Sequence, residues 1–380
     1  MKTGLVLSGG GSTGAYQIGV WKALNELNIK CDIVTGTSIG SINGAMYVTE
    51  DYDLAEKMWN GLNFKNIFSE DIKYESQKDE LDVIKKYISV ATKGGMEPNN
   101  LRENLIKCLN LDKFYTSSID YGLTTVNFPS LKSIKLTKNE IKREELIDYI
   151  LASSTVFPVF KLKQINNKKY IDGGVRDTMP YDLAIKMGAE RIIVVNTSYF
   201  FKYAKIPKKI TDKHEVIIIR PHNNTGPSLM FEQKQSKKNI KYGYNDTMKI
   251  FNKLYGNKYT FKSIPINDIF KNKKELINTV EYLGRIFKLD DSRIYSLKEY
   301  NKKIISNLDR VELKKVKNIK DIKSILNPQE RIKYIYTKIL NNDTRSISII
   351  KNILYKEYLA SYYLYNETTK NVRRWTPHIF

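Results

Sequence analysis

The amino-acid sequence predicts a three-layer α/β domain with a mainly parallel central sheet, followed by a basic, mainly helical C-terminal region. Through the first half of the chain, short apolar runs typical of buried strands alternate with segments of helical periodicity. A β-α-β-α order is complete within residues 4–46, which favours parallel strands joined by crossover helices. After about residue 250, glycine becomes rare and helical spacing prevails.

The first elements follow one another closely. Residues 4–7 (GLVL) predict a buried strand, and apolar residues at 20, 24 and 27 mark one face of the next helix. Residues 31–35 (CDIVT) predict a second strand, and apolar residues at 39, 42 and 46 share a face of a second helix. The segment 50–120 is mostly helical in pattern, and residues 180–187 predict a helix with proline near its first turn. Further strands are expected at residues 121–127, 134–136, 170–171, 191–196 and 216–219.

The composition excludes several classes of protein. Among 380 residues, 41% are hydrophobic and 27% are charged, which argues against a polytopic membrane protein and against wholesale disorder. Two cysteines, Cys31 and Cys108, are too few for a disulfide-stapled scaffold or a cysteine-rich zinc site. Three histidines leave little for a histidine metal cluster. We expect neither a metal nor a cofactor.

The charge is strongly positive and unevenly distributed. Lys and Arg number 63 against 41 Asp and Glu, which gives a formal net charge of +22. Residues 251–380 hold 27 of the basic and 13 of the acidic residues, which places a boundary near residue 250 between a domain 1–250 and a basic helical region 251–380. Such a surface attracts nucleic acid or an anionic membrane face. A compositional bias toward Lys, Asn and Ile is the alternative explanation.

No segment has the pattern of a signal peptide or a membrane-spanning helix. The longest uncharged stretch, residues 3–21, contains six glycines, a density that does not suit a helix within a bilayer. We therefore expect a cytoplasmic protein, or one that is peripheral to a membrane.

Two glycine-rich motifs follow the first two predicted strands. Residues 9–14 (GGGSTG) let backbone N–H groups approach an anion, and the helix that follows adds its positive dipole end. Residues 36–40 (GTSIG) have the strand-turn-helix setting of a nucleophile elbow, with Ser38 at its tip; a turn with a capping serine is the alternative. The motif residues are Gly9, Gly10, Gly11, Ser12, Thr13 and Gly14 in the loop, and Gly36, Ser38 and Gly40 in the elbow.

A third motif, Asp172-Gly173-Gly174, follows a short predicted strand. Its aspartate is either a turn residue or a base that faces a cleft. A nucleophilic serine needs a base, and the usual base is histidine, yet no histidine precedes His214. A triad of Ser38, Asp172 and either His214 or His222 fits the chain order of α/β-hydrolases, but an elbow this early in the chain does not fit that layout. An aspartate that acts directly on the serine needs no histidine.

Two nucleotide-binding interpretations fit less well. A dinucleotide site on the first glycine motif needs an acidic residue at the end of the second strand, and Gly36, Thr37 and Ser38 stand there instead. A P-loop is excluded because no Gly-Lys-Ser/Thr follows the glycines.

The three motifs together resemble the patatin-like phospholipase family. The resemblance rests on residues 5–27 (LVLSGGGSTGAYQIGVWKALNEL), residues 36–45 (GTSIGSINGA) and the block 152–196 that contains YIDGGV, and it covers roughly residues 3–200. It implies the three-layer fold, a Ser38–Asp172 dyad, and an oxyanion hole of backbone amides in residues 9–14, chiefly those of Gly10 and Gly11. It also implies a lipid substrate at a membrane surface, which the net charge predicts to be anionic; no nucleic-acid partner is expected.

The resemblance leaves some points open. The family often carries Arg or Lys where this chain has Thr13, so the preference for a lipid headgroup is not fixed. Hydrolysis of a lipid ester is the expected activity; acyl transfer to a lipid alcohol, or a non-catalytic lipid-binding module, are the alternatives. The tyrosines at 358, 362, 363 and 365 are expected to pack in the core of their own domain, with a membrane interface as the alternative.

Overall fold

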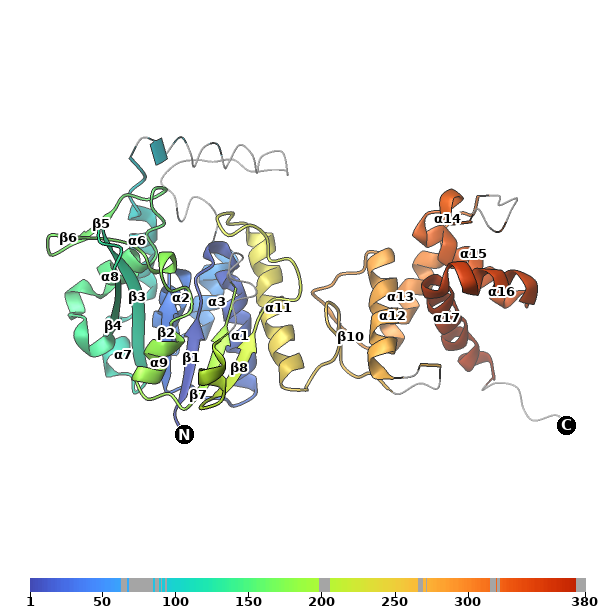
Figure 1. Ribbon diagram of the computed structural model, residues 1–380, viewed down its shortest axis with the longest axis horizontal. Helices are drawn as coiled ribbons and strands as arrows, with labels where there is room; N and C mark the ends of the chain where they lie inside the picture. The colour runs from blue at the N-terminus through green and yellow to red at the C-terminus, as the bar shows by residue number, and fades with distance from the viewer. Residues whose placement is uncertain are drawn as a thin grey trace. The chain divides into compact units, whose positions relative to one another are not determined.

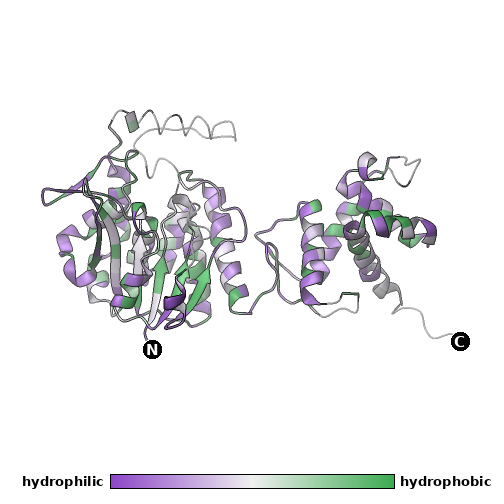
Figure 2. Cartoon of the chain, in the orientation of Figure 1, coloured by the Kyte–Doolittle hydropathy of each residue, from purple (hydrophilic) through white to green (hydrophobic). Residues whose placement is uncertain are grey.

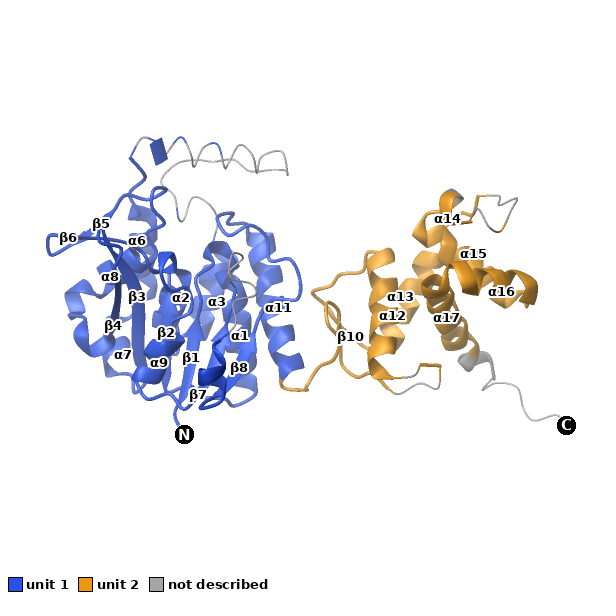
Figure 3. Ribbon diagram, in the orientation of Figure 1, with its two compact units in different colours: residues 1–250 blue, residues 251–380 orange. Residues whose placement is uncertain are grey.

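A computed structural model describes residues 1–62, 94–197, 206–265, 269–270, 272–314 and 322–373, together with residues 67, 85, 89, 91, 92 and 319. The chain divides into two compact units, residues 1–250 and 251–380 (Figure 3). Each unit has its own hydrophobic core.

The first unit is built on an eight-stranded mixed sheet (Figure 1). Along its main path the strand order is β5-β6-β3-β2-β1-β7-β8, and β4 also pairs with β3. The five strands β3, β2, β1, β7 and β8 are parallel to one another, whereas β4, β5 and β6 are joined by antiparallel pairing. The strands are β1 (Thr3–Leu7), β2 (Ile33–Thr37), β3 (Asp120–Phe128), β4 (Ser133–Thr137), β5 (Lys163–Ile165), β6 (Lys168–Asp172), β7 (Arg191–Val195) and β8 (Glu215–Ile219).

Helices cover both faces of this sheet, so the predicted three-layer architecture is confirmed. On one face α9 packs on β1 and β2; on the other, α2 packs on β1, β2 and β3, and α8 packs on β3, β5 and β6. The helices of this unit are α1 (Ala15–Glu26), α2 (Ile39–Val48), α3 (Tyr52–Gly61), α6 (Asn99–Cys108), α7 (Leu111–Thr116), α8 (Leu146–Ser153), α9 (Tyr181–Lys186), α10 (Lys208–Thr211) and α11 (Gln233–Ile250). Single 3-10 turns are η1 (Gly11–Gly14), η2 (Lys138–Glu140), η3 (Arg143–Glu145) and η4 (Gly173–Val175).

The predicted strands are confirmed, with two differences. The second strand is Ile33–Thr37, two residues later than expected, because its pairing with β1 begins at Gly4 opposite Ile33 and continues to Gly36. Strand β5 was not predicted, since its three residues KQI include a single apolar side chain. Of the segment 50–120, helices α3, α6 and α7 lie within the described residues; most of residues 63–93 lie outside them.

The second unit is mainly helical, as predicted. It also contains a two-stranded parallel sheet of β9 and β10. The apolar faces of its described helices form two buried clusters, and Figure 2 shows the mixed hydropathy of these helices. Three of the predicted aromatic residues, Tyr358, Tyr362 and Tyr365, pack against a buried cluster of this unit, and Tyr363 is fully buried, so the core interpretation is confirmed. The elements are β9 (Thr260–Phe261), α12 (Lys273–Ile286), β10 (Ile294–Tyr295), α13 (Leu297–Asp309), α14 (Ile322–Ile325), α15 (Pro328–Leu340), α16 (Thr344–Ile353) and α17 (Tyr355–Arg373).

None of the helices in the described part of either unit is both long enough and apolar enough to cross a bilayer.

Candidate functional site

The second glycine motif forms a sharp turn between β2 and α2, with Ser38 at its tip. Ser38 has a φ of 55° and a ψ of −127°, a strained conformation for a residue with a side chain. The flanking glycines are required by close backbone contacts. A Cβ on Gly36 would lie 2.2 Å from the Gly40 carbonyl oxygen, and one on Gly40 would lie 2.1 Å from the Leu7 carbonyl oxygen. The turn therefore has the geometry of a nucleophile elbow.

Hydrogen bonds from outside the motif hold this turn in place. The Ser38 backbone N–H donates to the Ser153 hydroxyl at 2.9 Å, and that hydroxyl donates to the Thr124 carbonyl of β3 at 2.7 Å. The Ser41 hydroxyl donates to the Ser38 carbonyl at 2.6 Å. Ser153 is fully buried at the end of α8. The N–H of Ser38 is thus already engaged and is not free to bind an anion.

The strand register brings Asp172 next to this elbow. On β3, Thr124 pairs with Thr37 at the end of β2, and Thr125 pairs with Asp172 at the end of β6. Strand β4 occupies the other edge of β3 along residues 122–126, so β2 and β6 share one edge and meet end to end. The residue after Thr37 therefore lies beside Asp172, two neighbours that are 134 positions apart in the sequence.

The Asp172 carboxylate has two polar neighbours in this position. The Gly174 backbone N–H donates to it at 2.7 Å, and the Ser38 hydroxyl is the other polar group beside it. The Asp172 side chain is buried, with 7% of the residue exposed. Burial raises the pKa of Asp172 to about 6 from an ordinary value of 3.8, and these two neighbours offset part of that rise. The carboxylate is a stronger base than a solvated aspartate.

Gly173 and Gly174 allow this approach. A Cβ on Gly173 would lie 2.2 Å from the Thr124 carbonyl oxygen and 2.9 Å from the Thr37 methyl group. Gly174 lies in the turn η4, and its N–H reaches back to the carboxylate of Asp172. The glycines of the third motif therefore serve packing and capping around the aspartate.

The first glycine motif contains two unengaged amides. The N–H of Gly9 donates to Thr178, that of Ser12 donates to Ser228, and that of Thr13 donates to Gly10. The N–H groups of Gly10 and Gly11 donate to no acceptor among the described residues. Gly9 lies against the elbow, since a Cβ built on it would be 3.3 Å from the Ser38 Cβ. Gly14, the last residue of the motif, packs against the side chains of Ile39 and Trp59.

A buried polar network joins this loop to the elbow helix. The Asn43 amide of α2 donates to the Gly14 carbonyl at 3.0 Å and to the Gln17 side-chain oxygen at 2.8 Å. The Gln17 amide donates to the Ser8 carbonyl at 2.7 Å, and the Trp59 indole N–H donates to Asn43 at 2.9 Å. Every member is buried and bonded, so the network fixes the spacing between loop and elbow.

These supporting residues had no predicted role. Ser153 lies in the block 152–196, Asn43 in the elbow motif and Gln17 in the block 5–27, so the motifs contained a signal without a role for any of the three. Trp59 carried no signal, because its role depends on a contact between separate helices.

Neither of the two histidines in the described part of the chain is a partner of Asp172. His222 lies 3.2 Å from Asp246, a buried carboxylate on α11 that also accepts from the Tyr16 hydroxyl. His214 is adjacent to β8, and His378 lies outside the described residues. Within the described ranges, no group of three or more His, Cys, Asp and Glu side chains has a geometry that could hold a metal ion.

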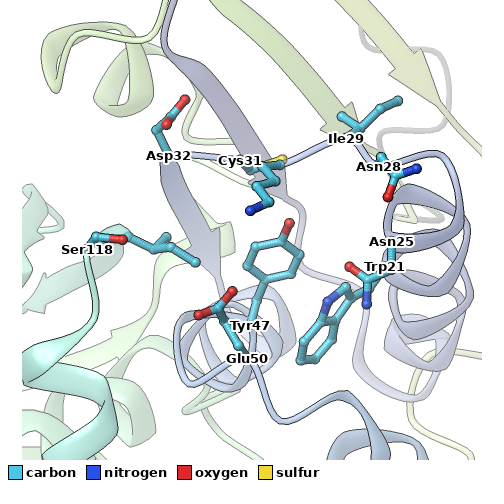
Figure 4. Close-up of a pocket in the computed structure, with 11 residues that line it drawn as sticks. Trp21, Asn25, Asn28, Ile29, Cys31, Asp32, Tyr47, Glu50 and Ser118 are labelled. Carbon is cyan, nitrogen blue, oxygen red and sulfur yellow. The ribbon is translucent and has the colours of Figure 1, made fainter.

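A cavity of about 520 Å³ lies at the opposite edge of the sheet (Figure 4). It is formed where α1 and α2 end and β2 begins, so the length of β2 separates it from Ser38. Trp21 and Tyr47 form part of its wall, and Cys31, Asp32 and Glu50 stand around it. No candidate site residue from the sequence lines this cavity.

Comparisons with known proteins point to one family. Residues 5–185 match the family described as "Patatin-like phospholipase". Lysophospholipase NTE1 of Phaeosphaeria nodorum is 29% identical over 198 residues, which cover 51% of this chain and 12% of that protein. Lysophospholipase nte1 of Aspergillus terreus is 57% identical over 47 residues, which cover 12% and 3%. The matched regions are therefore a small part of these relatives.

Solved structures with low sequence identity also align. A crystal structure of VipD from Legionella pneumophila is 13% identical and has a TM-score of 0.41, with 99% of this chain and 88% of that chain covered. A crystal structure of the type III effector protein ExoU is 12% identical and has a TM-score of 0.36, with 95% and 77% covered.

Proposed function

Because residues 5–185 form a domain of the patatin-like phospholipase family, we propose that this chain is a serine acyl-ester hydrolase that releases fatty acids from phospholipids or related lipids. One observation carries the proposal. The Ser38 hydroxyl lies beside a buried Asp172 carboxylate, next to a loop in which the Gly10 and Gly11 amides have no acceptor among the described residues.

In the proposed reaction, Asp172 accepts the Ser38 proton while the serine oxygen attacks the ester carbonyl. A carboxylate of pKa about 6 is mostly ionised at neutral pH, yet it takes up a proton more readily than an ordinary aspartate. The tetrahedral intermediate then loses the alcohol, which takes the proton from Asp172. Water hydrolyses the acyl-serine by the same route in reverse, with Asp172 again as the base.

The negative oxygen of the intermediate is assigned to the N–H groups of Gly10 and Gly11. The amides of Gly9, Ser12 and Thr13 in the loop and the amide of Ser38 are engaged with protein acceptors, which supports this choice. A well-placed donor stabilises such a transition state by about 3–4 kcal/mol. The N-terminus of α2, which begins directly after Ser38, favours negative charge at the same place.

The substrate is proposed to lie at an anionic membrane surface, where the protein binds peripherally. The net charge of +22 supports attraction to anionic headgroups.

The test is fatty-acid release from vesicles of phosphatidylglycerol and phosphatidylcholine. We expect Ser38→Ala and Asp172→Asn to lower the rate by at least about 1000-fold, as loss of a nucleophile or its base does in other serine hydrolases. Ser130→Ala and Asp212→Asn, which change exposed residues of the same types, serve as controls and should retain the wild-type rate. Product identification by mass spectrometry separates hydrolysis from acyl transfer to a lipid alcohol. Wild-type rates in both site variants would overturn the proposed dyad.

A further inference from the structure

Three large apolar side chains are exposed around the Ser38–Asp172 site: Leu131 at 37%, Phe157 at 46% and Val175 at 55%. We propose that they form a membrane-docking face, together with the neighbouring cations Lys132, Lys169 and Arg176, and that this face seats the site on an anionic lipid bilayer. The inference rests on the proposed function and adds to it the surface that contacts the lipid.

Short covalent and hydrogen-bonded paths connect the docking face to Asp172. Val175 ends η4, the turn that begins directly after Asp172. The Asp172 backbone N–H donates to the Thr155 carbonyl at 2.8 Å, and Phe157 follows two residues later. Val175 is therefore three residues from Asp172 in the chain, and Phe157 is two residues from Thr155, which is hydrogen-bonded to Asp172.

The apolar residues also neighbour one another. The Phe157 ring lies 5.6 Å from the ring of Phe128, the last residue of β3. Leu131 is in the turn that follows, where its N–H donates to the Asn127 carbonyl, and the Arg176 guanidinium donates to the Leu131 carbonyl at 2.9 Å. This last bond brings the turn beside Val175. The three side chains thus surround one end of β3.

Exposed basic residues surround these apolar side chains. Lys132 follows Leu131, Arg176 follows Val175, and Lys169 pairs with Phe128 across the β3–β6 ladder. Lys132 and Lys169 form no ion pair with any described residue. The nearby Asp177 is already paired with Lys135 at 2.6 Å.

This combination selects a lipid surface as the occupant. Exposed apolar side chains that are scattered singly are common, but here three occur at the mouth of a site for a lipid ester, with cations around them. Apolar side chains enter the boundary between headgroups and acyl chains, while Lys and Arg attract anionic headgroups. Docking on this face would bring the ester bonds of the bilayer to the elbow.

The experiment measures vesicle binding and catalysis separately, on the full chain. Binding to phosphatidylglycerol-phosphatidylcholine vesicles is measured by co-sedimentation in the Ser38→Ala background, so that no substrate is consumed. Leu131→Ser with Phe157→Ser, and separately Lys132→Gln with Lys169→Gln, should each reduce the bound fraction at least fivefold. Ile218→Ser and Leu340→Ser change exposed apolar residues elsewhere and should bind as the parent does.

For catalysis, the same variants are made in the protein that retains Ser38. They are assayed on vesicles and on a soluble short-chain p-nitrophenyl ester. We expect vesicle hydrolysis to fall with binding while hydrolysis of the soluble ester stays within twofold of wild type. Unchanged vesicle binding in the Leu131–Phe157 variant would overturn the docking face. An equal loss of soluble-ester hydrolysis would also overturn it. So would the finding that the wild type is a dimer and that the Leu131–Phe157 variant is a monomer that still binds vesicles, because the face would then be a dimer interface. If the wild type hydrolyses no ester, the proposed function fails, and the binding assay still decides the docking face.

Discussion

In the first unit, the amino ends of the parallel strands (the amino edge) and their carboxyl ends (the carboxyl edge) differ in chemistry. The amino edge has a cavity of about 520 Å³ with a cysteine and a tyrosine in its wall. The carboxyl edge has Ser38 and Asp172 beside a glycine loop. Burial raises the pKa of Cys31 to about 12, so this thiol stays protonated, whereas burial raises the pKa of Asp172 only to about 6.

A cavity alone therefore does not identify a reactive site. Burial disfavours the charged form of both groups, and each group would react only when ionised: Cys31 as a thiolate and Asp172 as a carboxylate. At pH 7 the shift leaves Asp172 mostly charged and Cys31 neutral. Unengaged amides and a strained serine are likewise found at the carboxyl edge.

Among the variants that test this contrast, we expect the largest loss of kcat from Gly11→Ala in the proposed oxyanion loop. Gly11 has a φ of +56°, and a Cβ there would lie 2.0 Å from the Ser228 carbonyl oxygen. The loop must move to accommodate the methyl group, which displaces the Gly10 and Gly11 amides. We expect kcat on a soluble ester to fall about 100-fold, the effect of losing one oxyanion donor.

The matched control for this loop variant is Gly61→Ala at the end of α3. A Cβ at Gly61 meets no atom within 4 Å, so the wild-type kcat should be retained. Circular dichroism and a urea melt show whether Gly11→Ala is folded. A folded Gly11→Ala protein with wild-type kcat would contradict the assignment of the oxyanion donors.

Part of this site was predictable from the sequence. The three motifs could be recognised because their glycines meet local requirements: a tight turn, a close carbonyl group, or a free N–H group. The strands were predictable from continuous apolar runs. The end-to-end meeting of β2 and β6 was not, because it depends on the register of each strand with β3. Ser153 was missed for the same reason, since its hydroxyl contacts residues 115 and 29 positions away.

A second test uses the pH dependence that follows from the pKa of Asp172. The proposed base is active when ionised, and its pKa is about 6. The ionised fraction falls from about nine-tenths at pH 7 to about one-tenth at pH 5, so kcat/KM on a soluble ester should fall about tenfold. A rate that is flat between pH 7 and pH 5 would show that Asp172 is not the base.

The stability of the fold should change in the opposite direction. The folded-state pKa of Asp172 is raised, so the group favours folding below pH 4 and loses that contribution as pH rises through about 6. Replacing the carboxylate by Asp172→Asn should therefore stabilise the protein at pH 7, by at most roughly 2–3 kcal/mol. Urea unfolding of both proteins at pH 4 and pH 7 measures this difference, which should vanish at the lower pH.

The smallest effect is expected at the amino edge, from Cys31→Ala. Cys31 is 3% exposed, so removing its sulfur leaves a small void and should cost about 1 kcal/mol of unfolding free energy. Because the thiol is neutral and lies at the other end of β2 from Ser38, kcat should stay within twofold of wild type. Urea unfolding and the soluble-ester assay measure the two quantities on one preparation. A tenfold loss of kcat without unfolding would mean that the amino edge takes part in the reaction, and the contrast between the two edges would then fail.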